Sequence, residues 1–428
     1  MSWLSRHRLR RFVKYSFWLF PSLAVVAAWA VGRCLVALAA DLDLRIIGEH
    51  NIDGARAMIG VFAASMLTFI VYTVSALLLA VQLASGQISP RLISLTFGRT
   101  STKAATSAFV FSFVLALVAL ANLAAGSEHE LLVVVAIIAN MVSIAVFFWF
   151  VEELGTSLRP VSILQFLFLQ GREAMDSVYG SAPISDQSPF DESAELPQPE
   201  LGRTVTRRDY SGTFLAFGRQ DLVALATKAD CIIELLPQVG DFVSIEDPLA
   251  RIYPADARID EETINKMMAF GAERTMELDP TFALRIMVDI CSRALSPAIN
   301  DPTTAVLAID QIHRLLRVAG LRNIDIGRVH GTDGKLRLVF PTPSWEDMVD
   351  LAVTEVRHYG ASSLQVARRT KAMIEHLIAA LPSSRAPALR RELVAIENSV
   401  ARMFPESEDR RRGGTADLQG LGGSPRRT

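Results

Sequence analysis

Long, uninterrupted runs of apolar residues mark the first third of the chain. Four runs reach the length of about 20 residues that a helix needs to cross a bilayer, and they cover residues 17–40, 58–84, 104–125 and 131–151. A helix in a water-soluble core seldom stays apolar on every face over such a length. The pattern therefore predicts a transmembrane domain of four helices over residues 1–155.

The pattern changes after the fourth run. Residues 156–180 are apolar with Arg159 and Arg172 at the flanks, which is typical of a juxtamembrane helix that leaves the membrane or lies along its inner surface. Residues 181–203 are rich in proline, serine and acidic side chains and are expected to form a linker. Short β-prone runs over residues 204–256 favour a small β-barrel. They resemble the barrel sandwich of biotinyl and lipoyl carriers, but no lysine lies at a hairpin tip, so a structural barrel is expected.

Helical periodicity returns in residues 257–404, which are predicted as a helical domain with a β-hairpin at residues 324–340. Residues 405–428 are polar, with Gly-Gly and arginine clusters, and are predicted as a disordered tail. The predicted fold class is a membrane α-helical domain followed by a cytoplasmic α+β domain. The last three helices are expected at about 345–359, 361–381 and 386–403.

Loop charges predict the orientation in the membrane. The N-terminal segment and the second loop carry arginine and lysine without an acidic residue, whereas the first loop is mostly acidic and the third is GSEHE. Positively charged loops remain on the cytoplasmic side. We therefore expect a multi-pass plasma-membrane protein with both termini in the cytoplasm and with the lipid bilayer as its partner.

Composition narrows the range of functions. Half of the 428 residues are hydrophobic. The net charge is −2, so the overall charge does not favour binding to nucleic acid. The three cysteines are far apart, and no histidine has a second histidine at ligand spacing. The sequence has no GxxxxGK[ST] phosphate loop, GxSxG elbow or HExxH pair. We therefore expect no enzymatic activity, no cofactor, no metal and no nucleic-acid partner.

Polar residues inside the predicted membrane helices are the first functional candidates. Five of them recur in the second helix at intervals of three, four and seven, so they share one face: Ser65, Thr68, Tyr72, Ser75 and Gln82. This face would either join helices by hydrogen bonds and close packing or line a water-filled path. Asn140 in the fourth helix allows the same two interpretations. No predicted span has a central Asp or Glu, which argues against a proton-coupled transporter.

The motif Asp-Pro-Thr occurs twice, beginning at Asp279 and at Asp301. Aspartate is a favoured N-cap, and proline is favoured at the first helical position. Two helices are therefore predicted, at about 280–295 and 302–318, joined by a corner of sequence SPAIN. The corner and its helices carry the second set of candidates: Asp279, Arg285, Asp289, Arg293, Ser296, Pro297, Asn300, Asp301 and Pro302.

A charged stripe runs along the first of these two helices. Arg285, Asp289 and Arg293 are spaced by four and therefore line one face. The stripe is interpreted either as a salt-bridged, partly solvated face or as a polar network at a subunit interface or on the route of an ion. The cap carboxylates repel anions, so an anion site at these helix N-termini is not expected.

Several segments together resemble a bacterial integral-membrane family known as domain-of-unknown-function family 2254. They are SGQISPRL after the second span, YSGTFLAF, DLVALA, GDFVSIEDPL and ERTMELDPTFALRIMVDICSRALSPAINDPTTA. The resemblance covers about Arg11 to Met403 and is most specific in RALSPAINDPTTA. The family typically has a glutamine where Leu278 stands and often a glycine where Ala283 stands, which bears only on those two positions. The resemblance implies a bacterial inner-membrane protein, and it implies no substrate, activity or cofactor.

The sequence leaves three functional hypotheses. The first is a homo-oligomeric channel or transport-like protein for a small solute or ion, with a cytoplasmic part assembled by symmetry. The second is a membrane-anchored sensor or scaffold that binds a ligand or protein on the cytoplasmic side. The third is an enzyme at the membrane surface, which the missing motifs disfavour.

Overall fold

The computed structural model describes residues 4–6, 9, 12–13, 16–42, 52–87, 99–124, 130–180 and 197–423. The chain divides into two compact units. The membrane unit comprises Arg8–Arg159, and the C-terminal unit comprises Met1–His7 together with Pro160–Thr428. Most of the predicted linker, residues 181–196, lies outside the described residues.

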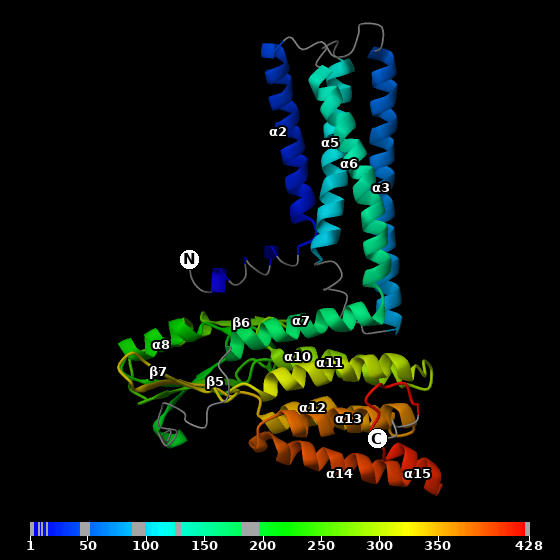
Figure 1. Ribbon diagram of the computed structural model, residues 1–428. Coiled ribbons are helices and arrows are strands. Elements are labelled where there is room, and N and C mark those ends of the chain that lie inside the picture. Colours follow the sequence, from blue (N-terminus) through cyan, green and yellow to red (C-terminus); the bar gives the residue numbers. More distant parts are fainter. Residues whose placement is uncertain are drawn as a thin grey trace. The chain divides into compact units, whose positions relative to one another are not determined.

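Four long helices form the membrane unit (Figure 1). Each contains a segment that is long and apolar enough to cross a membrane, in agreement with the four predicted runs. Helix α5 is central, because each of the other three helices packs against it more extensively than against any other. The helices are α2 (Leu19–Leu42), α3 (Ile52–Gln87), α5 (Thr100–Ala124) and α6 (Glu130–Ser157).

Small residues allow α5 to approach its neighbours closely. A Cβ atom at Gly32 of α2 would lie 2.8 Å from Val118 Cγ1 of α5, so only glycine fits at this contact. Ala116 and Ala119 of α5 are completely buried. Because lipid tails are as apolar as leucine, close van der Waals contact of this kind is what holds membrane helices together.

The C-terminal unit contains two open β-sheets in the described residues, which corrects the predicted small barrel. One sheet has the strand order β1-β5-β3-β8-β7, and the other has the order β4-β2-β6. The predicted hairpin supplies β7 and β8, and β8 pairs in parallel with β3 at Ile233↔Leu338. Thus the five-stranded sheet includes the hairpin that the sequence assigned to the helical domain, and its edges β1 and β7 remain apart. The strands are β1 (Arg203–Thr206), β2 (Gly212–Phe217), β3 (Ile232–Leu235), β4 (Phe242–Val243), β5 (Pro248–Tyr253), β6 (Met268–Gly271), β7 (Arg328–His330) and β8 (Leu336–Val339).

The two sheets enclose a shared apolar core, to which Phe214, Ile233 and Leu338 contribute fully buried side chains. The short sheet is also covered on a second side, where Leu4 packs with Leu215 and neighbouring residues. Strand β2 is therefore buried on both faces, as its nearly continuous apolar sequence requires. Two short helices complete this region, α8 (Arg219–Lys228) and α9 (Glu261–Asn265). The described residues of the unit also form 3-10 turns at Pro199–Leu201 and Ser383–Arg385.

The remaining helices of the C-terminal unit are stacked in tiers (Figure 1). Helix α7 packs on α10 and α11; α10 packs on α12, α11 on α13, and α14 covers both α12 and α13. The predicted helices of this region are all present, with bounds close to those expected. They are α7 (Pro160–Tyr179), α10 (Pro280–Ala294), α11 (Pro302–Gly320), α12 (Trp345–Gly360), α13 (Leu364–Ala380) and α14 (Ala386–Met403).

Residues 405–428 were predicted as a disordered tail, but the structure shows residues 405–423 folded against the C-terminal unit. Residues Ser407–Gly413 form α15, and the segment after it returns to α13. Arg368 of α13 is 5% exposed and donates to the carbonyls of Thr415 and Gly422. Asp417 accepts hydrogen bonds from three backbone N–H groups of the same segment. The tail is ordered because these bonds satisfy a buried guanidinium and the polar backbone of a glycine-rich loop.

Candidate functional site

Helix α3 has one face turned into the membrane unit and one turned out of it. The inward face repeats every three and four residues and is closed by apolar contacts with α5 and α6. Its buried members are Ala55, Ile59, Ala63, Met66, Thr73, Leu77 and Ala80. The predicted polar residues occupy the other side of the helix.

The structure places the five polar candidates of α3 together on this outward face. Ser65 is half-buried, and Thr68, Tyr72, Ser75 and Gln82 are exposed. We call these five residues the α3 polar stripe. Two of its hydroxyls bond to their own helix: Ser65 Oγ donates to Val61 O at 2.9 Å, and Thr68 Oγ1 donates to Ala64 O at 3.0 Å. Tyr72 is 45% exposed, and its ring meets Phe147 of α6 edge to face.

Asn140 lies inside the membrane unit and not on the outward face. Its Nδ2 donates to Ala136 O at 2.9 Å, whereas its Oδ1 is buried without a hydrogen-bond partner among the described residues. One turn further along α6, the Ser143 hydroxyl is 2.6 Å from the Ser112 hydroxyl of α5. The hydrogen bond of Asn140 therefore stays within α6, and the polar contact between α5 and α6 is made by Ser112 and Ser143. These two serines were missed because single serines in apolar runs carry no periodic signal.

The structure confirms the predicted helix–corner–helix at residues 280–318. Asp279 and Asp301 cap α10 and α11, and each accepts from the backbone N–H three residues later, at Phe282 and Thr304. The backbone N–H of Asp301 donates to Ala294 O at 2.7 Å and closes the corner. Both Asp-Pro-Thr motifs thus have a structural role as helix starts.

The residues between the two helices form a short exposed loop. Pro297 and Asn300 are exposed, and the Ser296 hydroxyl donates to Arg293 O at 2.7 Å. Asn300 has a φ of 49°, in the left-handed region that asparagine tolerates better than most residues. Pro302 follows at the first position of α11, where its missing N–H costs nothing.

Asp279 differs from Asp301 in its surroundings. It is 4% exposed, and its Oδ2 lies 4.0 Å from Arg274 Nε without a hydrogen-bond partner among the described residues. Burial raises the pKa of Asp279 above its ordinary value, although the Thr281 hydroxyl and Arg274 act against this. The neighbouring Tyr179 also has a raised pKa, because it is buried and because it lies near the charge of Asp279.

The charged stripe of α10 is a salt-bridged face within the C-terminal unit. Arg285 Nε donates to Asp289 at 2.7 Å, and both terminal nitrogens of Arg285 donate to Glu355 of α12, at 2.7 and 2.6 Å. These hydrogen bonds hold the pKa of Glu355 below its usual value. Arg293 is half-buried two turns beyond Arg285. The geometry agrees with the first of the two interpretations of this stripe, and the partner Glu355 was not singled out from the sequence.

The structure also brings together two histidines that are 63 positions apart. His313 Nε2 of α11 lies 2.7 Å from His376 Nδ1 of α13. Burial, followed by the nearby His376, Arg369 and Arg317, lowers the pKa of His313 to about 4. No sequence spacing could have indicated this pair, since its two members belong to different helices.

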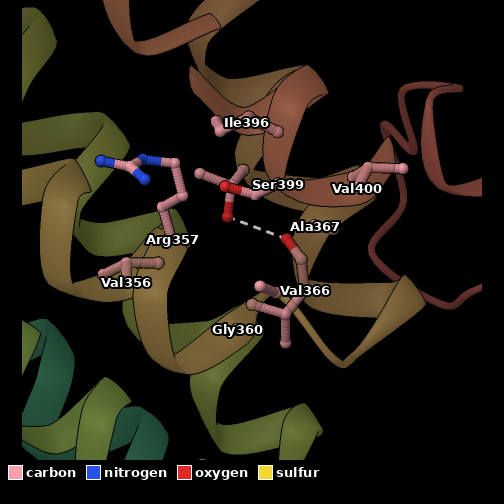
Figure 2. Close-up of a pocket in the computed structure, with 10 residues that line it drawn as sticks. Val356, Arg357, Gly360, Val366, Ala367, Ile396, Ser399 and Val400 are labelled. Carbon is pink, nitrogen blue, oxygen red and sulfur yellow. Dashed lines mark hydrogen bonds between the residues drawn. The ribbon is translucent and has the colours of Figure 1, made fainter. Parts of the chain in front are cut away.

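The described residues contain no group of three or more histidine, cysteine, aspartate or glutamate side chains that could hold a metal ion. A cavity between α12, α13 and α14 has a volume of about 10 Å³, which is the room that about one water molecule needs. Figure 2 shows the Arg357 guanidinium turned away from it, and this group bonds to Glu392 instead. The cavity is too small for a metabolite.

Four apolar helices with a spanning length, followed by a tiered unit of helices and sheets, are the architecture of a membrane protein with four candidate spans. The chain belongs to the family described as predicted membrane protein, DUF2254, whose model matches residues 14–376. This confirms the resemblance noted in the sequence.

Relatives with a similar sequence occur in mycobacteria. The chain is 24% identical to the uncharacterized protein Rv1290c of Mycobacterium tuberculosis over an alignment of 426 positions, which covers 95% of this chain and 80% of that protein. The same figures hold for the uncharacterized protein Mb1321c of Mycobacterium bovis. A search of solved structures finds no significant match.

Proposed function

We propose that several copies of this protein assemble in the membrane with their α3 polar stripes facing one another, and that the stripes line a path for a small solute or ion. One observation carries the proposal: the stripe is on the outside of its own four-helix unit. A polar face that its own subunit leaves uncovered is better placed against another protein surface or water than against lipid tails.

The members of the stripe do not contribute equally to this argument. Ser65 and Thr68 donate to carbonyls of their own helix, which lowers the cost of facing lipid. Tyr72 and Gln82 have longer side chains whose polar ends extend beyond their own backbone. Gln82 ends the spanning segment of α3, whereas Tyr72 lies well inside it. Tyr72 is therefore the strongest single reason to expect a polar partner.

The interior of one copy is a poor alternative route. Between α3, α5 and α6 the space is occupied by the packed side chains of Met66, Leu77, Phe109 and Phe150. The rings of Phe69 and Phe147 stack there at 4.2 Å. A path between copies requires no rearrangement of these contacts, and a symmetric ring of copies supplies it directly.

Cysteine reactivity tests whether the stripe is wet. With Cys34 replaced by serine, Thr68→Cys and Ser75→Cys are expected to react with a charged, membrane-impermeant thiol reagent. Leu67→Cys is exposed but lies to one side of the stripe, and Leu77→Cys is buried, so both should resist. Equal resistance of all four positions would exclude a water-filled path along α3.

A dry stripe would favour the second function, a membrane-anchored scaffold. Such a scaffold or sensor would bind a ligand or a protein on the cytoplasmic side, and the cavity between α12, α13 and α14 would not hold that ligand, because it has room for about one water. We propose no enzymatic activity, since the sequence carries none of the nucleophile, phosphate-loop or metal motifs that were sought.

We also propose a bacterial inner-membrane location with both termini in the cytoplasm. The contact of Leu4 with Leu215 supports this, because it keeps the start of the chain beside the C-terminal unit, as four spans require. A reporter that is active only in the periplasm, fused after Thr428, should be silent. Activity of that fusion would reverse the proposed orientation.

A further inference from the structure

Helix α7 begins directly after α6, the last helix of the membrane unit. The spanning segment of α6 ends at Ser157, and α7 starts at Pro160. Three residues of extended chain reach about 10 Å at most. The first turn of α7 therefore lies within about 10 Å of the end of α6.

One face of α7 is committed to the C-terminal unit. A Cβ atom at Gly171 would lie 2.8 Å from both Ala283 of α10 and Leu315 of α11, so the helices touch here through a glycine. The Phe168 ring lies under the Arg314 guanidinium of α11 at 3.9 Å. This face cannot turn toward lipid without breaking the tiers of helices below it.

The opposite face of α7 changes character along its length. In its first half, Val161 and Leu169 are 48% and 51% exposed and are eight residues apart, on one side of the helix. From Pro160 to Gly171 the helix has no charged residue. The second half exposes an ion pair between Arg172 and Asp176. Exposed apolar side chains are thus confined to the half that follows the membrane span, between Arg159 and Arg172.

We propose that the first half of α7 lies in the headgroup layer of the bilayer, with Val161 and Leu169 inserted among the upper acyl carbons. The partner is a phospholipid surface. Arg159 and Arg172 flank the uncharged first half of α7 and favour anionic headgroups. The inference stands independently of any path along α3.

Depth-dependent quenching in the full-length protein tests this inference. In nanodiscs with anionic lipid and with Cys34 replaced by serine, single cysteines at Val161 and Leu169 are labelled with an environment-sensitive fluorophore. Ser177, exposed on the second half of α7, and Val394, 56% exposed on α14, are the matched controls. Cys231 and Cys291 are buried and remain unlabelled in the folded protein.

A quencher carried on a lipid chain should reduce the emission of labels at Val161 and Leu169 at least about twofold more than that of the controls, because only inserted side chains meet it. Aqueous iodide should quench the control labels more strongly than the labels at Val161 and Leu169. Iodide quenching of the Val161 and Leu169 labels as strong as that of the controls would overturn the proposal. All four positions are exposed, so labelling does not disturb the core.

Discussion

Arg285 of α10 and Glu355 of α12 form a two-pronged ion pair, with nitrogen–oxygen distances of 2.7 and 2.6 Å. The two residues are 70 positions apart, and their pairing joins the helix that precedes the corner to the next tier. It shows that a charged stripe which could have marked an ion route contributes to the packing of the C-terminal unit.

The first prediction concerns this pair. Arg285→Lys should lower the free energy of unfolding by about 1 kcal/mol, because lysine cannot donate twice to one carboxylate and because the pair is partly exposed to solvent. The pKa of Glu355 is depressed, so its contribution is present above its ordinary pKa of 4.5 and is lost as the pH falls through the lower, folded value. Thermal unfolding in detergent at pH 7 and pH 3 measures both effects. A Glu355→Gln variant with an unchanged melting temperature at pH 7 would contradict the stabilising role.

The second prediction separates a cap from a functional charge at Asp301. Asp301→Ala should lower the free energy of unfolding by about 1 kcal/mol, the usual value of an N-cap. Asp301→Asn should be nearly silent, because the amide oxygen can still accept from the Thr304 N–H. Thermal unfolding compares the two variants. If the asparagine variant lost solute flux in liposomes while keeping its melting temperature, Asp301 would have a role that capping does not explain.

The third prediction uses the buried Asp279. Its pKa is raised in the folded protein, so the contribution of Asp279 is most favourable at low pH and is lost as the pH rises through the folded pKa. Asp279→Asn keeps an acceptor for the Phe282 N–H without a buried charge. The variant should have the same melting temperature as the wild type at pH 4 and a higher melting temperature than the wild type at pH 7. Lower stability of the variant at both pH values would show that the charge is needed.

The fourth prediction concerns the histidine pair. The pKa of His313 falls from 6.5 to about 4 on folding, so the unfolded chain binds the proton more readily and stability is lost as the pH falls from about 6.5 toward 4. His313→Gln should reduce this loss between pH 7 and pH 5. His358→Gln, at an exposed histidine of α12, is the matched control and should not. Equal slopes for wild type and His313→Gln would rule out this contribution.

Local features of the fold were readable from the sequence, whereas contacts between distant segments were not. The caps at Asp279 and Asp301 follow from three adjacent residues each. The hairpin containing Leu338 was predicted, but its parallel pairing with Ile233 joins segments 105 positions apart. Because the sequence did not indicate this pairing, the strands of residues 204–256 were predicted to form a barrel by themselves. Asp417 organises the tail through bonds to Gly420 and Gly422 that composition alone cannot indicate.

For the candidate site too, the sequence predicted local features but not the contacts between helices. Periodicity grouped Ser65, Thr68 and Ser75 on one face of α3, and the structure agrees. Which way that face points depends on the contacts of α5 and α6 with Ile59, Ala63 and Leu77, which periodicity in one helix cannot supply. His313 and His376 were seen as isolated residues for the same reason.

The central claim is that copies of the protein meet along the outward face of α3, and disulfide formation between copies tests it most directly. In a variant with Cys34 replaced by serine, Thr68→Cys and Ser75→Cys in native membranes should form covalent dimers on mild oxidation. Val26→Cys on α2 is 63% exposed and serves as the control that should remain monomeric. The account predicts dimers at the two α3 positions only; dimers at Val26→Cys alone, or at none of the three, would contradict it.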